Sequence, residues 1–282
     1  DVFVTNLRQH AVARLGLDEE PVRKARPDII YCIANGFGSD GPYADRAAYD
    51  DVIQAASGMS SMFAWNGDPQ FVPSIVADKI TGIHMAFAIA SALRSQAVSG
   101  AGATIEVPMA ETVAAFNLVE HLGGQTFDPP FGGFSYARVR TPHRRPRRTA
   151  DGWIAVLPYT LESLQRFFAF GGQPELIDDP RFETAADRVT NADSLYALLD
   201  DVVRTKTTAE WLGFCGEHSI PASRVAELEE LGDDEHFAAV ELFRTDDHPT
   251  EGPYRYVRDP IVWDRRPSTI RRHAPKLGAD TR

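Results

Sequence analysis

The sequence predicts an α/β protein in which a large domain with a parallel sheet is interrupted by a smaller, mostly helical α+β domain. Two observations carry this prediction. Short apolar runs alternate with helical patterns over the first 122 residues, as they do in βαβ units. The pattern then breaks in a stretch rich in glycine, proline and arginine, and it resumes as a series of helices with polar cap residues.

In the large domain, the run Asp28–Asn35 is the clearest strand. It is apolar almost throughout and lies between Pro27 and Gly36, which indicates a strand buried on both faces of a parallel sheet. Further strands are expected at 1–6, 71–76 and 103–107, helices at 12–17, 19–25, 49–59 and 109–122, and a turn at 65–70. A helix is also expected to follow the strand at 71–76 directly and to run to about 97. Because it is apolar nearly all round and rich in small residues, we expect it to be buried.

The remaining chain is expected to form a linker, a small domain and a return segment. The predicted boundaries are 1–122 for the large domain, 123–148 for the linker, 149–243 for the small domain and 244–282 for a segment that returns to the large domain. In the small domain, a strand is expected at 153–156, and Thr160, Asn191 and Thr208 are expected to cap three helices. Short strands are expected again at 251–264.

Composition and charge exclude several classes of protein. The 282 residues are 43% hydrophobic and 24% charged, which suffices for a sizeable core. A net charge of −11 argues against nucleic-acid binding, which usually needs a basic surface. The cysteines, Cys32 and Cys215, show neither metal-ligand nor disulfide spacing, so we expect core residues, no metal and a cytoplasmic location. The absence of 18 consecutive apolar residues and of a signal peptide predicts no membrane span.

The turn Gly36–Gly41 matches the dinucleotide-binding pattern G-x-G-x-x-G only literally. Pro42 and Tyr43 follow it where a long helix should begin, and no acidic residue ends a second strand some 20 positions later. We therefore interpret it as a glycine turn that lets the chain pass close to a neighbour.

Several short motifs occur together in a characteristic order. They are Val4–Arg8 with Arg14–Gly16, Gly36–Tyr43 with Tyr49–Gly58, Ala77–Gly82, Gly100–Met109, Arg148–Trp153, Asp179–Phe182 and Ile220–Ala222. In this combination the chain resembles the class III CoA-transferases of the CaiB/BaiF type. The resemblance implies a Rossmann-like large domain, an interlocked homodimer, an acyl-CoA and a small carboxylic acid as substrates, and no permanently bound cofactor. It also implies that an N-terminal βαβ unit of the family fold is absent from this chain.

The resemblance implies that Asp78 is the catalytic nucleophile, which forms an aspartyl anhydride and then an enzyme–CoA thioester. An aspartate is ionised at pH 7 and needs no general base, although an aspartate at a helix start is more often only a cap. The resemblance further assigns contacts with CoA to Asn6, Leu7, Arg8, Arg14, Ala47, Ala48, Tyr49 and Asp50. For these residues, a solvated arginine, an ordinary turn and a core aromatic are the structural alternatives.

Two other functions stay open on the sequence. Racemases that act on α-methylacyl-CoA share this fold but place a histidine where Tyr49 stands, and tyrosine is a poor base near neutral pH. His84 is expected to be a packed helix residue. A non-catalytic CoA-binding subunit is the second alternative, because of the missing N-terminal unit.

Two features of the linker have no firm assignment. The basic run 143–148 is interpreted as solvated rather than as a phosphate site. The glycine pairs Gly123–Gly124 and Gly132–Gly133 are candidates for a loop over the site.

Overall fold

The computed structural model describes residues 1–64, 67–136 and 138–281. The chain forms two compact units, one of residues 1–145 with 177–198 and one of residues 146–176 with 199–282. The boundaries predicted at 122, 148 and 243 stay predictions, as does the return of 244–282 to the large domain. Part of the turn predicted at 65–70 lies outside the described residues.

The first unit contains a parallel sheet of three strands with β2 in the middle. The strands are β1 (Val2–Thr5), β2 (Ile30–Ile33) and β3 (Ala103–Glu106). All four residues of β2 are buried. A central parallel strand is covered on both faces, which explains why its sequence is apolar throughout. The predicted parallel sheet is confirmed.

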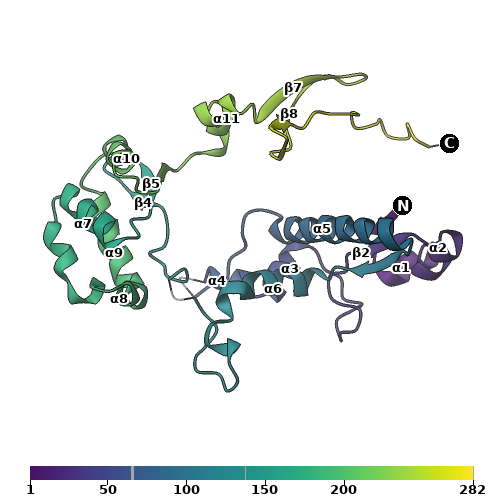
Figure 1. The fold of residues 1–282 in the computed structure, drawn as a ribbon, viewed down its shortest axis with the longest axis horizontal. Coiled ribbons are helices and arrows are strands. Elements are labelled where there is room, and N and C mark those ends of the chain that lie inside the picture. Colours follow the sequence, from purple (N-terminus) through teal and green to yellow (C-terminus); the bar gives the residue numbers. More distant parts are fainter. Residues whose placement is uncertain (65–66, 137, 282) are drawn as a thin grey trace. The chain divides into compact units, whose positions relative to one another are not determined.

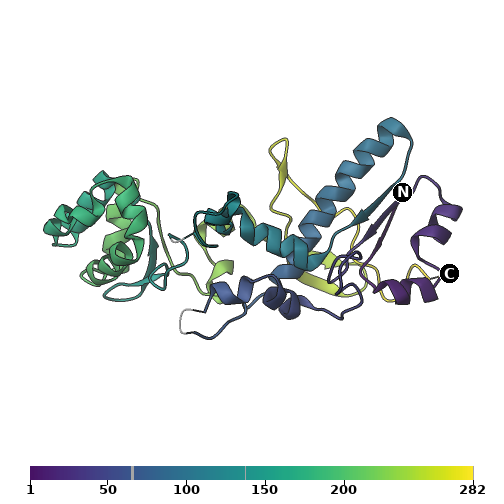
Figure 2. The same ribbon diagram turned by 90° about the horizontal axis from the view of Figure 1, so that it is seen from below.

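Helices cover both faces of this sheet, as Figures 1 and 2 show. The long helix α5 (Val76–Ser99) packs against β2 and β3. The short helices α1 (Gln9–Arg14) and α2 (Glu19–Ala25) lie on the other side, where the hydroxyl of Tyr31 donates to the carbonyl of Leu17 between them at 3.0 Å. The sheet is therefore one layer of an α/β unit.

Three helices of this unit meet through their first turns. Here α5 packs against α3 (Asp50–Ala56) and α6 (Met109–His121), and the short helix α4 (Met59–Met62) packs beside them. The buried residues of this cluster are Ile53, Met59, Ala77, Ala110 and Val113. Because Ala77 and Ala110 are small, the starts of α5 and α6 can approach closely.

The strand predicted at 71–76 does not form. Residues 71–75 are irregular, and α5 begins at Val76. Pro73 has no N–H to donate to a ladder. The side chain of Gln54 also takes the place of a neighbouring strand, because its Oε1 accepts the Val72 N–H at 2.8 Å and its Nε2 donates to the Ser74 carbonyl at 3.2 Å.

The expectation that α5 is buried is wrong for this chain. Among its residues, Ala77 and Thr81 are buried, whereas Phe87 is 74% exposed. The sequence has no 18 consecutive apolar residues, which predicted no membrane span. By length and composition alone, however, α5 is long and apolar enough to cross a membrane. Core helices of soluble proteins meet the same criterion, and the contacts of α5 with β2, β3, α3 and α6 place it in the layer that packs on the sheet.

The second unit has its own core. Its antiparallel sheet consists of β4 (Arg147–Arg148), β5 (Trp153–Val156) and β6 (Ala222–Arg224), beside the helices α7 (Leu161–Phe170) and α10 (Thr208–Glu217). The ring of Trp211 is fully buried and stacks on Phe167 with 4.3 Å between the ring centroids. Its indole N–H donates to the carbonyl of Val203 at 2.8 Å, so the one polar group of this side chain is satisfied.

The polar residues expected to cap helices predict the start of some of these helices correctly. Thr160 caps α7 in a reciprocal box with Ser163, as predicted. The cap of α10 is Thr207 instead of Thr208, because Thr207 forms a reciprocal box with Glu210, while the Thr208 hydroxyl bonds to Asp151 at 3.0 Å.

The remaining elements complete the chain. They are α8 (Ala185–Thr190), α9 (Ala192–Val203), α11 (Glu235–Ala239), β7 (Phe243–His248), β8 (Gly252–Val257), β9 (Val262–Trp263), β10 (Arg266–Pro267) and 3-10 helices at Gly123–Thr126, Pro174–Asp178, Pro180–Phe182 and Leu228–Gly232. The strands predicted at 251–264 form as β8 and β9. The pattern missed β7, whose pairing with β8 holds a polar segment in a hairpin.

Candidate active site

Asp78 lies in the first turn of α5, and its side chain is exposed. The residue before the helix is Ile75, which has no side-chain oxygen that could cap it. The backbone N–H of Asp78 donates instead to Oδ2 of Asp50 at 2.9 Å. Partial desolvation, followed by the negative charge of Asp50, raises the pKa of Asp78 above its ordinary value. The structure thus presents an accessible carboxylate at the start of a helix.

Asp50 and Gln54 hold this position from α3. Asp50 is 6% exposed and Gln54 is fully buried. The amide of Gln54 donates to Oδ1 of Asp50 at 2.6 Å, which leaves Oδ2 for the N–H of Asp78. The predicted contact of Asp50 with CoA stays a prediction, and both oxygens of its carboxylate are bonded inside the unit. The sequence shows the i, i+4 spacing that places Asp50 and Gln54 on one helix face. It does not show that these two side chains hold the start of α5.

The glycine turn that follows β2 is packed against neighbours. A Cβ at Gly36 would lie 2.7 Å from Cβ of Ala48, and a Cβ at Gly38 would lie 2.9 Å from Oε1 of Glu111. The N–H of Gly38 donates to Glu111 at 2.9 Å. The next N–H, of Ser39, donates to Glu106 at 2.8 Å. Since carboxylates of the protein occupy these donors, the turn serves close packing, as the sequence indicated, and is not a phosphate cradle.

The residues predicted to bind CoA fall into two groups. Asn6, Leu7, Arg8 and Arg14 are exposed and follow the carboxyl end of β1. Among the described residues, neither guanidinium has an ion-pair partner, so both are available to an anion. Ala47, Ala48 and Tyr49 directly precede α3, and Tyr49 is 84% exposed. The bond between Asp50 and Asp78 brings this second group to the candidate nucleophile, whereas no described bond joins the first group to it.

The other candidate residues of the sequence are a histidine, two cysteines and the basic run, and the structure shows what surrounds each of them. His84 is exposed instead of packed, and its Nδ1 lies 2.8 Å from the carbonyl of Ile80 in its own helix. Both cysteines are buried, as expected, and burial raises the pKa of the Cys215 thiol to about 11. Arg147, in the basic run, is not solvated: it is 3% exposed and forms an ion pair with Asp200 at 3.3 Å. In the described part of the chain, no cluster of three His, Cys, Asp or Glu side chains could hold a metal ion.

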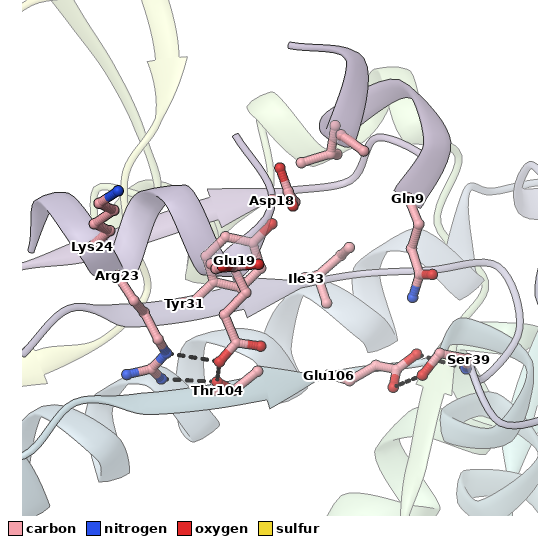
Figure 3. Close-up of a pocket in the computed structure, with 13 residues that line it drawn as sticks. Gln9, Asp18, Glu19, Arg23, Lys24, Tyr31, Ile33, Ser39, Thr104 and Glu106 are labelled. Carbon is pink, nitrogen blue, oxygen red and sulfur yellow. Dashed lines mark hydrogen bonds and ion pairs between the residues drawn. The ribbon is translucent and has the colours of Figure 1, made fainter. Parts of the chain in front are cut away.

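A large cavity of the first unit is not lined by Asp78. It has a volume of about 1060 Å³ and lies between α1, α2 and the sheet (Figure 3). Figure 3 shows bonds among several of its polar residues, but none to Gln9, Asp18 or Lys24. Arg23 bonds to Glu19 at 2.7 Å and to Thr104 at 2.8 Å, and Glu106 bonds to Ser39. Of the residues predicted to bind CoA, none lines this cavity.

The fold and the site together define an α/β protein whose candidate reactive group is a carboxylate at the start of a helix. A model of CoA-transferase family III matches residues 1–281. The chain therefore belongs to CoA-transferase family III, and it is an enzyme of the CoA-transferase class. The resemblance seen in the sequence is confirmed.

Named relatives agree with this assignment. The chain is 30% identical to a succinate–glutarate CoA-transferase of Agrobacterium fabrum, over 99% of this chain and 70% of that protein. It is 26% identical to a formyl-CoA:oxalate CoA-transferase of Afipia carboxidovorans, over 100% of this chain and 71% of that protein. The chain thus spans about 70% of the length of these relatives.

Solved structures show the same fold. An aspartate-to-alanine variant of Rv3272 from Mycobacterium tuberculosis superimposes with a TM-score of 0.83, at 23% identity, over 99% of this chain and 74% of that one. A CAIB/BAIF family protein from Brucella suis superimposes with a TM-score of 0.77, at 26% identity, over 99% of this chain and 73% of that one.

Proposed function

We propose that this protein transfers coenzyme A from an acyl-CoA to a small carboxylic acid, with Asp78 as the nucleophile. The single observation that carries the proposal is the accessible carboxylate of Asp78, held at the start of α5 through its backbone N–H. A carboxylate attacks a thioester without a general base when it is ionised, as an aspartate is near pH 7.

The reaction runs through three covalent states of Asp78: two anhydrides and, between them, a CoA thioester. A carboxylate oxygen of Asp78 attacks the thioester carbon, the C–S bond breaks, and the CoA thiolate leaves an acyl–aspartyl anhydride. The thiolate then attacks the aspartyl carbonyl, which releases the donor acid and leaves an enzyme–CoA thioester. The acceptor carboxylate attacks this thioester to form a second anhydride. The thiolate attacks the acceptor carbonyl of that anhydride, so that the new acyl-CoA leaves and the carboxylate of Asp78 returns.

The CoA contacts belong to the same proposal. The exposed guanidiniums of Arg8 and Arg14 suit phosphate oxygens, because each presents a fork of donors. Asn6 and Leu7 would lie along the same part of the ligand, and Ala47, Ala48 and Tyr49 would lie along the pantetheine arm that leads to Asp78. CoA is a substrate in this proposal, and no permanently bound cofactor takes part.

The arrangement favours transfer over isomerisation. Racemisation at an α-carbon needs two bases, and Tyr49 stands where a racemase would place its histidine. The other nearby imidazole, His84, has its Nδ1 engaged by the carbonyl of Ile80. Incubation with a 2-methylacyl-CoA in deuterium oxide tests this choice: we expect no exchange at the α-carbon, and exchange without CoA transfer would support the isomerase.

We further propose that the enzyme acts in the cytoplasm as a homodimer. The exposed apolar side chains of α5 and α6, among them Phe87 and Val119, support a second copy as their cover. The substitution Phe87→Glu should shift the mass in light scattering toward the monomer. Leu228→Glu, at an equally exposed apolar residue of the second unit, is the control and should leave the mass unchanged.

Trapping of the covalent intermediate tests the nucleophile. Full-length enzyme is incubated with acyl-CoA and hydroxylamine, and the peptide that contains residue 78 is examined by mass spectrometry. We expect a hydroxamate at Asp78 that is lost in Asp78→Asn and kept in Asp51→Asn. A hydroxamate at another residue, or activity that survives Asp78→Asn, would refute the assignment. A panel of acyl-CoAs and acids, read as exchanged thioesters, then identifies the donor and the acceptor.

A further inference from the structure

Asp50 is a buried acid whose two oxygens have separate partners. Oδ1 accepts the amide of Gln54 at 2.6 Å, and Oδ2 accepts the backbone N–H of Asp78 at 2.9 Å. Both oxygens act as acceptors, as those of an ionised carboxylate do. Asp50 is therefore the cap of α5, supplied by another helix because Ile75 has no group for this task.

The position of this carboxylate is set by the packing around it. Gln54 is fully buried, and it bonds to Asp50 as well as to the backbone of Val72 and Ser74. One side chain of α3 thus links the segment before α5 to the acid that caps α5. A buried polar network with all its members bonded has little freedom to shift.

The charge of Asp50 acts on Asp78 as well. Of the other charged groups near this turn, Lys79 bonds to the hydroxyl of Ser74 at 2.8 Å, and Glu111 accepts the N–H of Gly38. The negative charge of Asp50 disfavours a negative charge on Asp78, which raises the pKa of Asp78 beyond the effect of desolvation alone.

We propose that Asp50 is a positioning residue for CoA transfer: it fixes Asp78 through the backbone N–H and promotes formation of the anhydride through charge repulsion. The inference rests on the proposed function of Asp78. Acylation removes the negative charge from Asp78, so the repulsion present in the free enzyme is relieved in that step. Such a ground-state effect accelerates the step because negative charge already leaves the Asp78 carboxylate in the transition state, where the repulsion is partly relieved.

The decisive variant is Asp50→Asn, compared with Asp51→Asn. An asparagine has an NH₂ group in place of one of the two oxygens, so either the Gln54 amide or the Asp78 N–H would face a donor, and it carries no charge. Asp51 is the adjacent acid of the same helix turn and is exposed, which makes it a matched control for charge and location. The rate of anhydride formation is measured as hydroxylamine trapping at residue 78, over a range of pH and of acyl-CoA concentration.

We expect Asp50→Asn to lower the maximal trapping rate by about 10- to 100-fold, as a displaced nucleophile does. The KM for acyl-CoA should stay near that of the wild type, because both oxygens of the Asp50 carboxylate are bonded inside the unit. The acid limb of the pH profile should move to lower pH, because the repelling charge is gone. Asp51→Asn should leave the rate, the KM and the acid limb unchanged. A merely structural role for Asp50 would lower the rate without moving the acid limb.

A second variant separates position from charge and serves if Asp50→Asn does not fold. Asp50→Glu keeps the charge but displaces the oxygens, so the maximal rate should fall while the acid limb does not move to lower pH. A wild-type rate in Asp50→Glu, or a wild-type acid limb in folded Asp50→Asn, would overturn the inference. If Asp78→Asn still formed the adduct, the proposed function itself would fail. If the adduct is lost in Asp78→Asn but Asp50→Asn changes neither the trapping rate nor the acid limb, only the positioning role is refuted.

Discussion

Replacement of Gln54 by leucine tests how the start of α5 is held. Gln54 is fully buried, and its Oε1 accepts the Val72 N–H at 2.8 Å while its Nε2 donates to Oδ1 of Asp50 at 2.6 Å. Leucine is similar in size and fills the site. The substitution therefore removes the hydrogen bonds with little change in packing. It leaves the partly buried Val72 N–H and one oxygen of the buried Asp50 carboxylate without this partner, whereas the carbonyl of the exposed Ser74 can bond to water.

The expected cost follows from these two groups. A buried polar group without a partner costs about 1–3 kcal/mol, with more for a charged group, so the two together cost about 3–6 kcal/mol. The additional apolar surface of leucine returns about 1 kcal/mol. We expect the free energy of unfolding of the first unit to fall by about 2–5 kcal/mol, a large part of the stability of a domain.

Two measurements check this expectation. Urea denaturation reports the free energy of unfolding, and amide hydrogen exchange reports the protection of Val72 and Asp78, whose N–H groups depend on Gln54 and Asp50. Gln70→Leu, at an exposed glutamine, is the control. Ordinary surface substitutions change the free energy of unfolding by up to about 0.5 kcal/mol. If Gln54→Leu changes it by no more than that and the two amides keep their protection, Gln54 does not hold the start of α5.

Three further predictions concern other charges and the thiols. Asp200→Leu removes the carboxylate that lies 3.3 Å from the buried Arg147 guanidinium and should lower the free energy of unfolding by about 1–3 kcal/mol. Asp201→Leu, at an exposed acid, should have little effect, and equal effects of the two variants in urea denaturation would contradict this. Because folding raises the pKa of Asp78, its ionised form opposes folding, and this penalty appears as pH rises through the raised pKa. Asp78→Asn should therefore be more stable than the wild type at pH 7 but not at a pH below the ordinary aspartate pKa, and an equal stability difference at both pH values would speak against the shift. Cys215, with its pKa of about 11, should not react with a thiol reagent in the folded protein at pH 8, and rapid modification would show that its surroundings open.

Short sequence patterns predicted an element correctly where that element depends mainly on neighbouring residues of the chain. The apolar run of β2 and the cap residue Thr160 lie where the sequence placed them, because strand burial and helix capping are decided within a few residues. Thr207, rather than Thr208, caps α10 through a reciprocal box with Glu210, which is also a local signal, because the two residues lie three positions apart. The hydroxyl of Thr208 bonds instead to Asp151, which lies 57 positions earlier in the chain.

The segment before α5 shows why other features could not be predicted. Its apolar residues and its position before a helix indicated a strand, but a strand needs a partner, and Gln54 supplies the bonds that a ladder would have supplied. The exposure of α5 has a similar origin. Composition states that a helix is apolar, whereas only the neighbouring elements determine which of its sides are covered.

For Asp78, the sequence established its residue type, its place at the start of a helix and the family motif around it. These are local properties, since a short stretch of chain contains all of them. The folded chain added Asp50, 28 positions earlier, as the acid that caps α5 and repels the charge of Asp78. This contact exists because α3 and α5 pack through their first turns, and distances across a packed interface are not encoded in any single stretch of sequence.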